Sequence, residues 1–224
     1  MSAPREKTFL LARPEGRMLE WIARRLPAWV MPDHLTALGV LAAIGIAVAY
    51  ALSNQDPIWL WAASGLLVVH WLGDSLDGTL ARVRRSERPR YGYYLDHLVD
   101  AIATALIGIG LGLSPFMLLA TGLAIVIAYL VLSINTYLET NTLGVFSLGY
   151  GRLGPTEARV GLIVLNTLLA LGVPPAITVL GLGVTVIDVA VLAIVALMLG
   201  ALLERAFRNL RELARLEPPP QAAP

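Results

Sequence analysis

The 224-residue sequence contains no cysteine and only three histidines. Disulfide bonds and thiolate metal sites are therefore excluded, and the histidines are too few and too far apart to form a zinc site. Lysine is almost absent as well, because Lys7 is the single lysine among 17 basic residues. This preference for arginine is typical of GC-rich genomes and points to a bacterial protein.

Charge is also scarce. Only 15% of the residues are charged, whereas a soluble domain has about a quarter. Hydrophobic residues make up 57% of the chain and the mean hydropathy is +0.70. The length suits a single domain over residues 1–224, so the apolar excess indicates a lipid bilayer rather than a larger core.

We expect an all-α membrane protein with six membrane-spanning helices. A crossing of roughly 30 Å of hydrocarbon needs about 20 mostly apolar residues, and the sequence offers six such segments: about 34–53, 57–84, 91–113, 115–138, 155–171 and 184 onward. Residues 1–33 would form a cytoplasmic or interfacial segment, 34–207 the six-helix bundle and 208–224 a cytoplasmic tail. Proline and glycine in 174–187 leave the beginning of the last helix least defined.

The basic residues test this count. With six spans, all 17 fall on the side of the N-terminus, and the opposite connections near 54–57, 113–115 and 172–183 contain none. Cytoplasmic loops of membrane proteins are enriched in lysine and arginine. We therefore expect both termini to face the cytoplasm, in a bacterial inner membrane.

An amphipathic helix is expected over residues 14–30, before the first span. Its apolar residues recur at helical spacing, and its arginines interrupt them; the apolar residues are Met18, Leu19, Trp21, Ile22 and Leu26. Such a helix can lie in the headgroup layer. The alternative is a cytoplasmic cap that packs on the bundle.

Four aspartates stand at the inner ends of two successive spans: Asp74, Asp77, Asp96 and Asp100. Each carboxylate in a span costs about 2.5–3.5 kcal/mol on insertion scales. At about 100° per residue, the first pair shares one face with Gly78, Ala81 and Arg82, and the second pair forms a stripe with Gly92. The short basic connection makes the two helices antiparallel neighbours, so the stripes can face each other.

Carboxylates gathered in one pocket repel each other, and divalent cations remove that repulsion. An all-oxygen set of ligands suits Mg²⁺ or Mn²⁺. Two such ions can clamp a pyrophosphate. The small side chains would let a nucleotide approach the backbone, and Arg82 can pair with a phosphate oxygen.

The four aspartates have two other interpretations. The aspartates can simply pair with arginines of the 82–90 stretch. They can also mark a cation or proton pathway, although they cluster at one membrane face and the outer halves of the spans carry few polar groups, Asp188 excepted.

The motif resembles the signature of the CDP-alcohol phosphotransferases. DSLDGTLAR (residues 74–82), nine residues and GYYLDHLVD (residues 92–100) match the pattern DxxDGxxAR, eight or nine residues, GxxxDxxxD at all eight fixed positions. PDHLT (residues 32–36) is similar to the family's Pro-Asn-x-(Leu/Ile)-Thr segment, with Asp33 where asparagine is usual.

The resemblance implies specific roles. The four aspartates would hold two ions of Mg²⁺ or Mn²⁺, and Asp100 would also take the proton of the attacking hydroxyl. The CDP site would be lined by Gly78, Ala81, Arg82, Gly92 and Thr36. CMP would leave as the group passes to a lipid or polar alcohol. The family is often dimeric, and nothing indicates a nucleic-acid partner.

The resemblance leaves the substrate open. CDP-diacylglycerol with a polar alcohol (glycerol phosphate, inositol phosphate or serine) is one pairing, and CDP-choline or CDP-ethanolamine with diacylglycerol is the other. His97 after Asp96, and a Thr-Glu pair ending in Glu157, are similar to the second group. His97 is thus a candidate acid or base, or only a partner that orients a carboxylate. His70 is expected to be a packed or hydrogen-bonded core residue.

Overall fold

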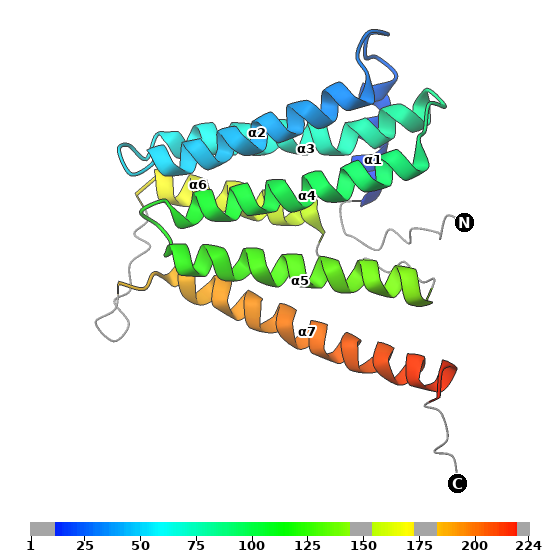
Figure 1. The fold of residues 1–224 in the computed structure, drawn as a ribbon. Coiled ribbons are helices and arrows are strands. Elements are labelled where there is room, and N and C mark those ends of the chain that lie inside the picture. The colour runs from blue at the N-terminus through cyan, green and yellow to red at the C-terminus, as the bar shows by residue number, and fades with distance from the viewer. Residues whose placement is uncertain (1–11, 144–153, 173–182, 219–224) are drawn as a thin grey trace.

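The computed structural model describes residues 12–143, 154–172 and 183–218, which form seven helices (Figure 1). Their bounds are α1 Ala12–Ala23, α2 Pro32–Leu52, α3 Trp59–Val83, α4 Pro89–Gly112, α5 Leu119–Leu143, α6 Pro155–Ala170 and α7 Val186–Leu216. Helices α2–α7 correspond to the six expected segments. Arg5, Lys7 and Arg152, most of the 174–187 stretch and the end of the tail lie outside the described residues.

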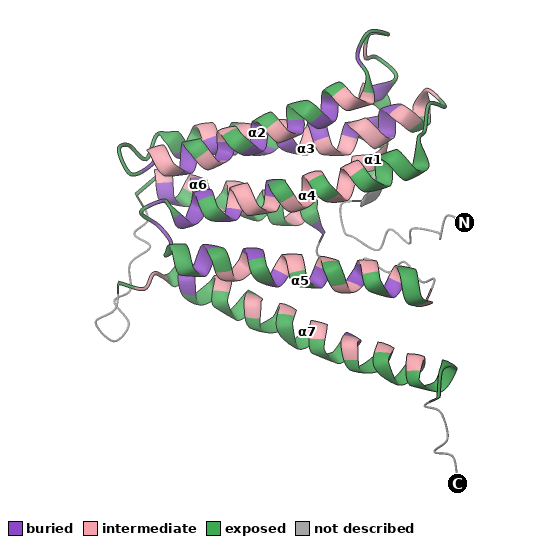
Figure 2. Cartoon of the chain, in the orientation of Figure 1, coloured by how far each residue is buried: buried purple, intermediate pink, exposed green. Residues whose placement is uncertain are grey.

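Four helices are long and apolar enough to cross a membrane among the described residues: α2, α4, α5 and α7. Helix α6 has only 16 residues, about 24 Å at 1.5 Å per residue, and polar groups such as His70 and Asp74 lower the hydropathy of α3. Large apolar side chains on the outer faces are exposed, for example Leu41 (65%) and Leu197 (75%) (Figure 2). These features indicate an integral membrane protein; the count of six spans stays a prediction.

Helix α1 is shorter than expected. It ends at Ala23 instead of residue 30, because Pro27 has no backbone N–H and disfavours helical geometry in the residue before it. Leu19 and Ala23 are buried in a cluster with Leu35 and Leu80 of the next two helices, while Trp21 remains 57% exposed. The helix therefore packs on the bundle with one face and leaves an aromatic residue on another.

Glu15 fastens α1 to two helices of the bundle. Its carboxylate accepts hydrogen bonds from Trp71 Nε1 (2.8 Å) and Ser75 Oγ (3.5 Å) of α3. It also accepts one from Thr156 Oγ1 of α6 (3.1 Å). Glu15 belongs to no motif, so nothing in the sequence predicts this bridging role.

The α3–α4 hairpin is held apart by α2. Helix α2 packs on both α3 and α4, whereas α3 and α4 are not a closely packed pair among the described residues. Outward from this centre, α6 packs on α3, α5 on α4 and α7 on α5 (Figure 1). The expected antiparallel neighbours thus face each other across a space that α2 borders.

Glycines set the separation of α2 and α3 close to the aspartates. A Cβ built on Gly73 would lie 2.7 Å from both the backbone nitrogen of Gly39 and the carbonyl oxygen of Leu35. Two helix backbones can approach this closely only where side chains are absent. Gly73 directly precedes Asp74, so this contact fixes where that aspartate stands relative to α2.

Asp188 is a structural residue at the other end of the bundle. It is fully buried at the beginning of α7, and it accepts hydrogen bonds from Thr185 N (2.8 Å) and Leu118 N (2.9 Å). The carboxylate caps α7 and joins it to the segment that precedes α5. Helix α5 consequently begins four residues later than expected, after buried Phe116 and Met117. Asp188, the acid noted in the outer halves of the spans, therefore has a structural role in capping a helix.

Substitution of Gly73 by alanine should destabilise the protein. The added methyl group would meet backbone rather than a movable side chain, and overpacking of this kind typically costs about 1–3 kcal/mol. The matched control is Gly65→Ala on the same helix, where a Cβ meets nothing within 4 Å. Thermal unfolding in detergent should show a lower midpoint for Gly73→Ala only; equal midpoints would contradict the backbone contact.

Substitution of Glu15 by alanine should loosen α1. It leaves three donors on α3 and α6 without their acceptor, and hydrogen bonds to a charged group contribute about 1.5–3 kcal/mol. We expect faster trypsin cleavage after Arg24 and Arg25, measured by mass spectrometry, and no change for Glu20→Ala on the exposed face of α1. Unchanged cleavage of the Glu15 variant would show that the helix is held by its apolar face alone.

Candidate active site

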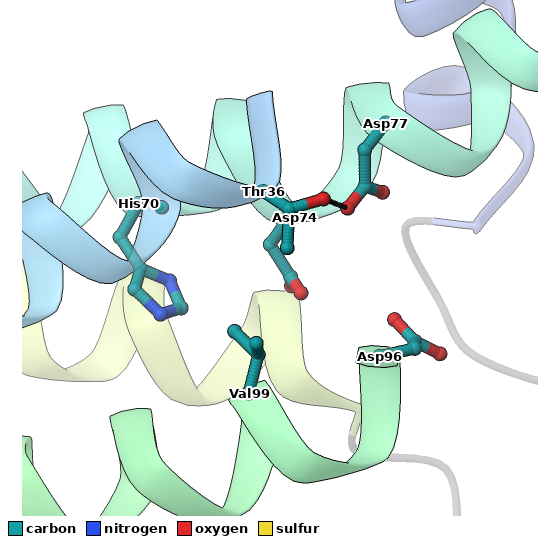
Figure 3. Close-up of a pocket in the computed structure, with 7 residues that line it drawn as sticks. Thr36, His70, Asp74, Asp77, Asp96 and Val99 are labelled. Carbon is teal, nitrogen blue, oxygen red and sulfur yellow. Dashed lines mark hydrogen bonds between the residues drawn. The ribbon is translucent and has the colours of Figure 1, made fainter. Parts of the chain in front are cut away.

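A pocket opens between α2, α3 and α4, where three of the four motif aspartates meet. Its lining residues are Thr36, Gly39, His70, Asp74, Asp77, Asp96 and Val99. Figure 3 shows Asp74 and Asp77 projecting from α3, and Asp96 from α4 on the opposite side. The two acidic stripes predicted from the spacing thus face a common space.

Asp77 is held by α2 and by its own helix. Thr36 Oγ1 donates a hydrogen bond to Asp77 Oδ2 at 2.6 Å (Figure 3), and the backbone N–H of Gly78 donates to Asp77 Oδ1 at 2.5 Å. Thr36 is itself buried one turn into α2. The threonine of the PDHLT segment therefore lies in the site, in contact with a carboxylate.

Asp74 is paired with an arginine from a distant segment. Arg159 Nη2 lies 2.6 Å from Asp74 Oδ2, and both side chains are largely buried, at 13% and 21% exposure. The arginine stands on α6, which packs on α3. Arg159 is one of the 17 basic residues that the six-span arrangement places on the side of the N-terminus. Nothing in the sequence indicated which acid it would reach.

Asp100 completes the acidic group from the next turn of α4. Its carboxyl interacts with those of Asp74 and Asp96, and Asp77 interacts with the same two. Asp100 is not among the residues that line the pocket surface. Asp74 and Asp96 therefore each repel both of the other motif acids.

The motif aspartates are residue types that suit divalent cations, although their side chains do not converge on a single coordination centre. No group of three or more histidine, aspartate or glutamate side chains in the described ranges has the arrangement of a metal site. Asp74 faces Arg159 and Asp77 faces Thr36. The set nevertheless consists of oxygen donors with several mutually repelling negative charges, which is the chemistry that Mg²⁺ and Mn²⁺ require.

Of the residues expected at the nucleotide, Thr36 lines the pocket, and the other four lie in the α3–α4 hairpin toward the basic connection. A Cβ on Gly92 would meet nothing within 4 Å, and one on Gly78 would meet only Arg82 Nη1 at 3.4 Å. Arg82 is exposed and donates to Thr79 Oγ1 at 3.0 Å, while Ala81 is half-buried. This part of the α3–α4 hairpin therefore has open space along its backbone and an accessible guanidinium.

His97 lies next to the carboxylates without lining the pocket. Its ring is placed between Tyr93 (4.2 Å between ring centroids) and Tyr137 of α5 (5.0 Å). Its Nδ1 atom is 3.5 Å from Asp96 Oδ2. This position suits a residue that orients Asp96. Glu157 caps the beginning of α6 by accepting a hydrogen bond from Gly154 N at 2.9 Å.

Arginines of the 82–90 stretch have other partners. Arg84 donates to the carbonyl oxygens of Leu26 (3.2 Å) and Pro27 (2.8 Å), which ties the α1–α2 connection to the end of α3. Arg88 pairs with Asp33 and lies over the ring of Tyr91. The alternative in which these arginines neutralise the motif aspartates is therefore not supported for Arg84 or Arg88.

A family model and several known proteins are similar to this chain. A family model described as CDP-alcohol phosphatidyltransferase matches residues 29–203, from the connection before α2 into α7. Cholinephosphotransferase 1 of Danio rerio is 26% identical over 163 residues, which are 67% of this chain and 41% of that protein. The chain thus spans about two fifths of the length of this relative.

Two other relatives carry different names. CDP-diacylglycerol–serine O-phosphatidyltransferase of Encephalitozoon cuniculi is 32% identical over 120 residues, 49% of this chain and 31% of that protein. Phosphatidylinositol phosphate synthase of Cutibacterium acnes is 34% identical over 88 residues, 39% of this chain and 40% of that protein. Since the family model covers well over half of the sequence and includes the whole acidic pocket, the chain belongs to the CDP-alcohol phosphatidyltransferase family.

Proposed function

We propose that this protein transfers a phosphate-linked group from a CDP-activated donor to an alcohol, with release of CMP, in phospholipid synthesis. The observation that carries the proposal is the convergence of Asp74, Asp77 and Asp96 on one pocket at the motif end of α3 and α4. Structural ion pairs alone do not explain this convergence, because Arg159 pairs with Asp74 whereas the described partners of Asp77 are a hydroxyl and a backbone N–H.

The four aspartates would hold the two divalent ions, Mg²⁺ or Mn²⁺. When bound, such ions polarise the pyrophosphate and stabilise the charge of the leaving CMP oxygen. The chain prepares the carboxylates for this role: Thr36 orients Asp77 and Arg159 orients Asp74 through bonds of 2.6 Å each. Both partners come from helices outside the motif, so the ligand geometry depends on the packing of α2 and α6 against α3.

Other residues of the hairpin would bind the donor and move the proton. Gly78, Ala81 and Gly92 leave room for the nucleotide, and the exposed Arg82 can pair with its phosphate. Asp100 takes the proton from the acceptor hydroxyl. The acceptor oxygen then bonds to the phosphorus of the transferred group, and the bond from that phosphorus to the bridging oxygen breaks, with CMP keeping the electron pair. His97 steadies Asp96 through its ring position between Tyr93 and Tyr137.

For the substrate, we favour CDP-choline or CDP-ethanolamine with diacylglycerol. The Asp96-His97 pair and the name of the Danio rerio relative support this choice. The alternative is CDP-diacylglycerol with glycerol phosphate, inositol phosphate or serine, which the names of the other two relatives support. Both pairings bring one lipid and one soluble molecule to a site at the membrane surface.

The proposed setting is a bacterial inner membrane, with the site and both termini on the cytoplasmic side. The basic residues of the 82–90 connection stand beside the pocket and would attract an anionic donor. A homodimer is part of the proposal by analogy with the family. Two other functions compete with this proposal. A transporter would move protons or cations without releasing CMP, and a scaffold would tolerate loss of the aspartates.

Replacement of Asp100 by asparagine should abolish turnover. Asparagine keeps the shape but cannot accept the hydroxyl proton, and general-base catalysis contributes about 10²–10⁴-fold. CMP release from CDP donors, measured by chromatography on purified protein, should fall by at least about 100-fold. The control is Asp56→Asn in the α2–α3 connection at the other end of the bundle, which should keep wild-type rates. Retained turnover in the Asp100 variant would remove this residue as the base.

Chelation should stop CMP release, and Mn²⁺ or Mg²⁺ should restore it. Because Thr36 orients Asp77, the Thr36→Val variant should need about tenfold more Mn²⁺ for half-maximal rate, whereas Thr36→Ser should stay near the wild type. Each titration would use CDP-choline or CDP-ethanolamine with diacylglycerol, and CDP-diacylglycerol with the polar alcohols. Mass spectrometry of the product identifies the pairing. Turnover that persists in chelator would contradict the metal-dependent mechanism.

A further inference from the structure

His70 is a pocket residue that the motif does not include. It stands one turn before Asp74 on α3 and is 3% exposed. Its Nδ1 atom is buried and has no hydrogen-bond partner among the described residues. The expectation of a packed side chain is confirmed, but no hydrogen bond holds this atom. Buried polar atoms are nearly always bonded, so an unbonded one inside a pocket points to a missing partner.

The imidazole lines the same space as the carboxylates. His70, Asp74 and Asp96 all contribute to the pocket wall. Figure 3 shows the ring on the side of α3 that faces Val99 of α4, next to Asp74. The partner of Nδ1 would therefore be a molecule that occupies the pocket together with the groups held by the aspartates.

Position along the helix separates His70 from the nucleotide. At 1.5 Å per residue, His70 lies about 6 Å from Asp74 and about 12 Å from Gly78 along α3, in the direction away from the basic connection. The pocket thus has two different ends. His70 lines the pocket beyond Asp74, whereas Arg82 stands on the opposite side of that aspartate along α3.

The chemistry of this second end suits a hydroxyl group. A neutral imidazole offers one N–H donor and one nitrogen acceptor, which matches an alcohol that can both accept and donate. A phosphate would need cationic donors, and the guanidinium of Arg159 beside Asp74 is already paired with that carboxylate; an alkyl chain would not satisfy a buried nitrogen. The side chain of Val99 gives the carbon next to the hydroxyl an apolar neighbour in the pocket wall.

We propose that His70 binds the hydroxyl of the acceptor alcohol and positions it for attack. This inference rests on the proposed transferase function and adds to it the residue that recognises the acceptor. The imidazole exchanges no proton in the step, because the proton passes to Asp100. A lipid alcohol would reach this end from the depth of the membrane, and a polar alcohol from the cytoplasm; the ligand group is the same hydroxyl in both cases.

The test compares His70→Leu with His70→Asn. Leucine has no hydrogen-bonding group, whereas the amide of asparagine places a polar atom near the Nδ1 position. His70→Leu should raise the KM for the acceptor about tenfold and leave the KM for the CDP donor within about twofold. His70→Asn should recover most of the loss. His34→Leu, at an exposed histidine whose Nδ1 accepts from Met31 N, is the matched control and should change neither constant.

Equilibrium binding provides a second readout that does not need turnover. Purified protein would be titrated with dioctanoylglycerol and, separately, with glycerol 3-phosphate, serine and inositol phosphate, with tryptophan fluorescence as the signal. We expect one alcohol to bind the wild type about tenfold more tightly than His70→Leu. The thermal midpoint of His70→Leu should equal or exceed that of the wild type, because an unbonded buried nitrogen is removed.

The outcomes separate the two proposals. A wild type that releases no CMP from any donor overturns the transferase function. Equal acceptor KM and equal alcohol binding for wild type and His70→Leu overturn the role of His70, in which case a buried water is its partner and the transferase function stands. If His70→Leu raises the KM for the donor instead of the acceptor, the role of His70 in acceptor binding is also overturned, because the imidazole would then contact the nucleotide.

Discussion

The structure depends on keeping four carboxylates together inside an apolar helical bundle. Each of these acids costs free energy in a membrane span, and close to one another they also repel. The protein meets this constraint with contacts from elsewhere in the chain. Arg159 of α6 neutralises Asp74, and Thr36 of α2 hydrogen-bonds to Asp77. The remaining negative charge favours the cations on which the proposed chemistry depends.

The same helices that neutralise the acids also shape the space between them. Helix α2 packs on α3 and α4 and keeps them from closing on each other. Its backbone contact at Gly39 and Gly73 sits directly before Asp74. The pocket is thus a consequence of small residues at one helix crossing, and its position is tied to the rigid core and not to a loop. A site on such a support holds its geometry more accurately than one on a connection.

Several contacts at the motif end hold segments that are remote in sequence. Glu15 joins α1 to α3 and α6, and Arg84 joins the connection after α1 to the end of α3. At the opposite end, Asp188 and the fully buried pair Tyr50 and Asn166 serve as structural polar contacts. Among the described residues, buried polar groups therefore occur at both ends of the bundle, and the mutually repelling motif acids lie at one of them. The same residue types thus make structural contacts at one end of the bundle and form the proposed catalytic site at the other.

Sequence alone determined the helical class, the position of six long segments and the facing of the two acidic stripes. These features follow from local rules: apolar length, and a helical period that places Asp74 with Asp77 and Asp96 with Asp100 on shared faces. Sequence missed the end of α1 at Ala23 and the later beginning of α5, where proline and a buried turn decide the boundary. The tertiary structure alone decided that Arg159 reaches Asp74, that Glu15 is a bridging acceptor, and that His70 faces the pocket. Those contacts join helices that are up to 141 residues apart, and no periodicity along one helix specifies which face of another will meet it.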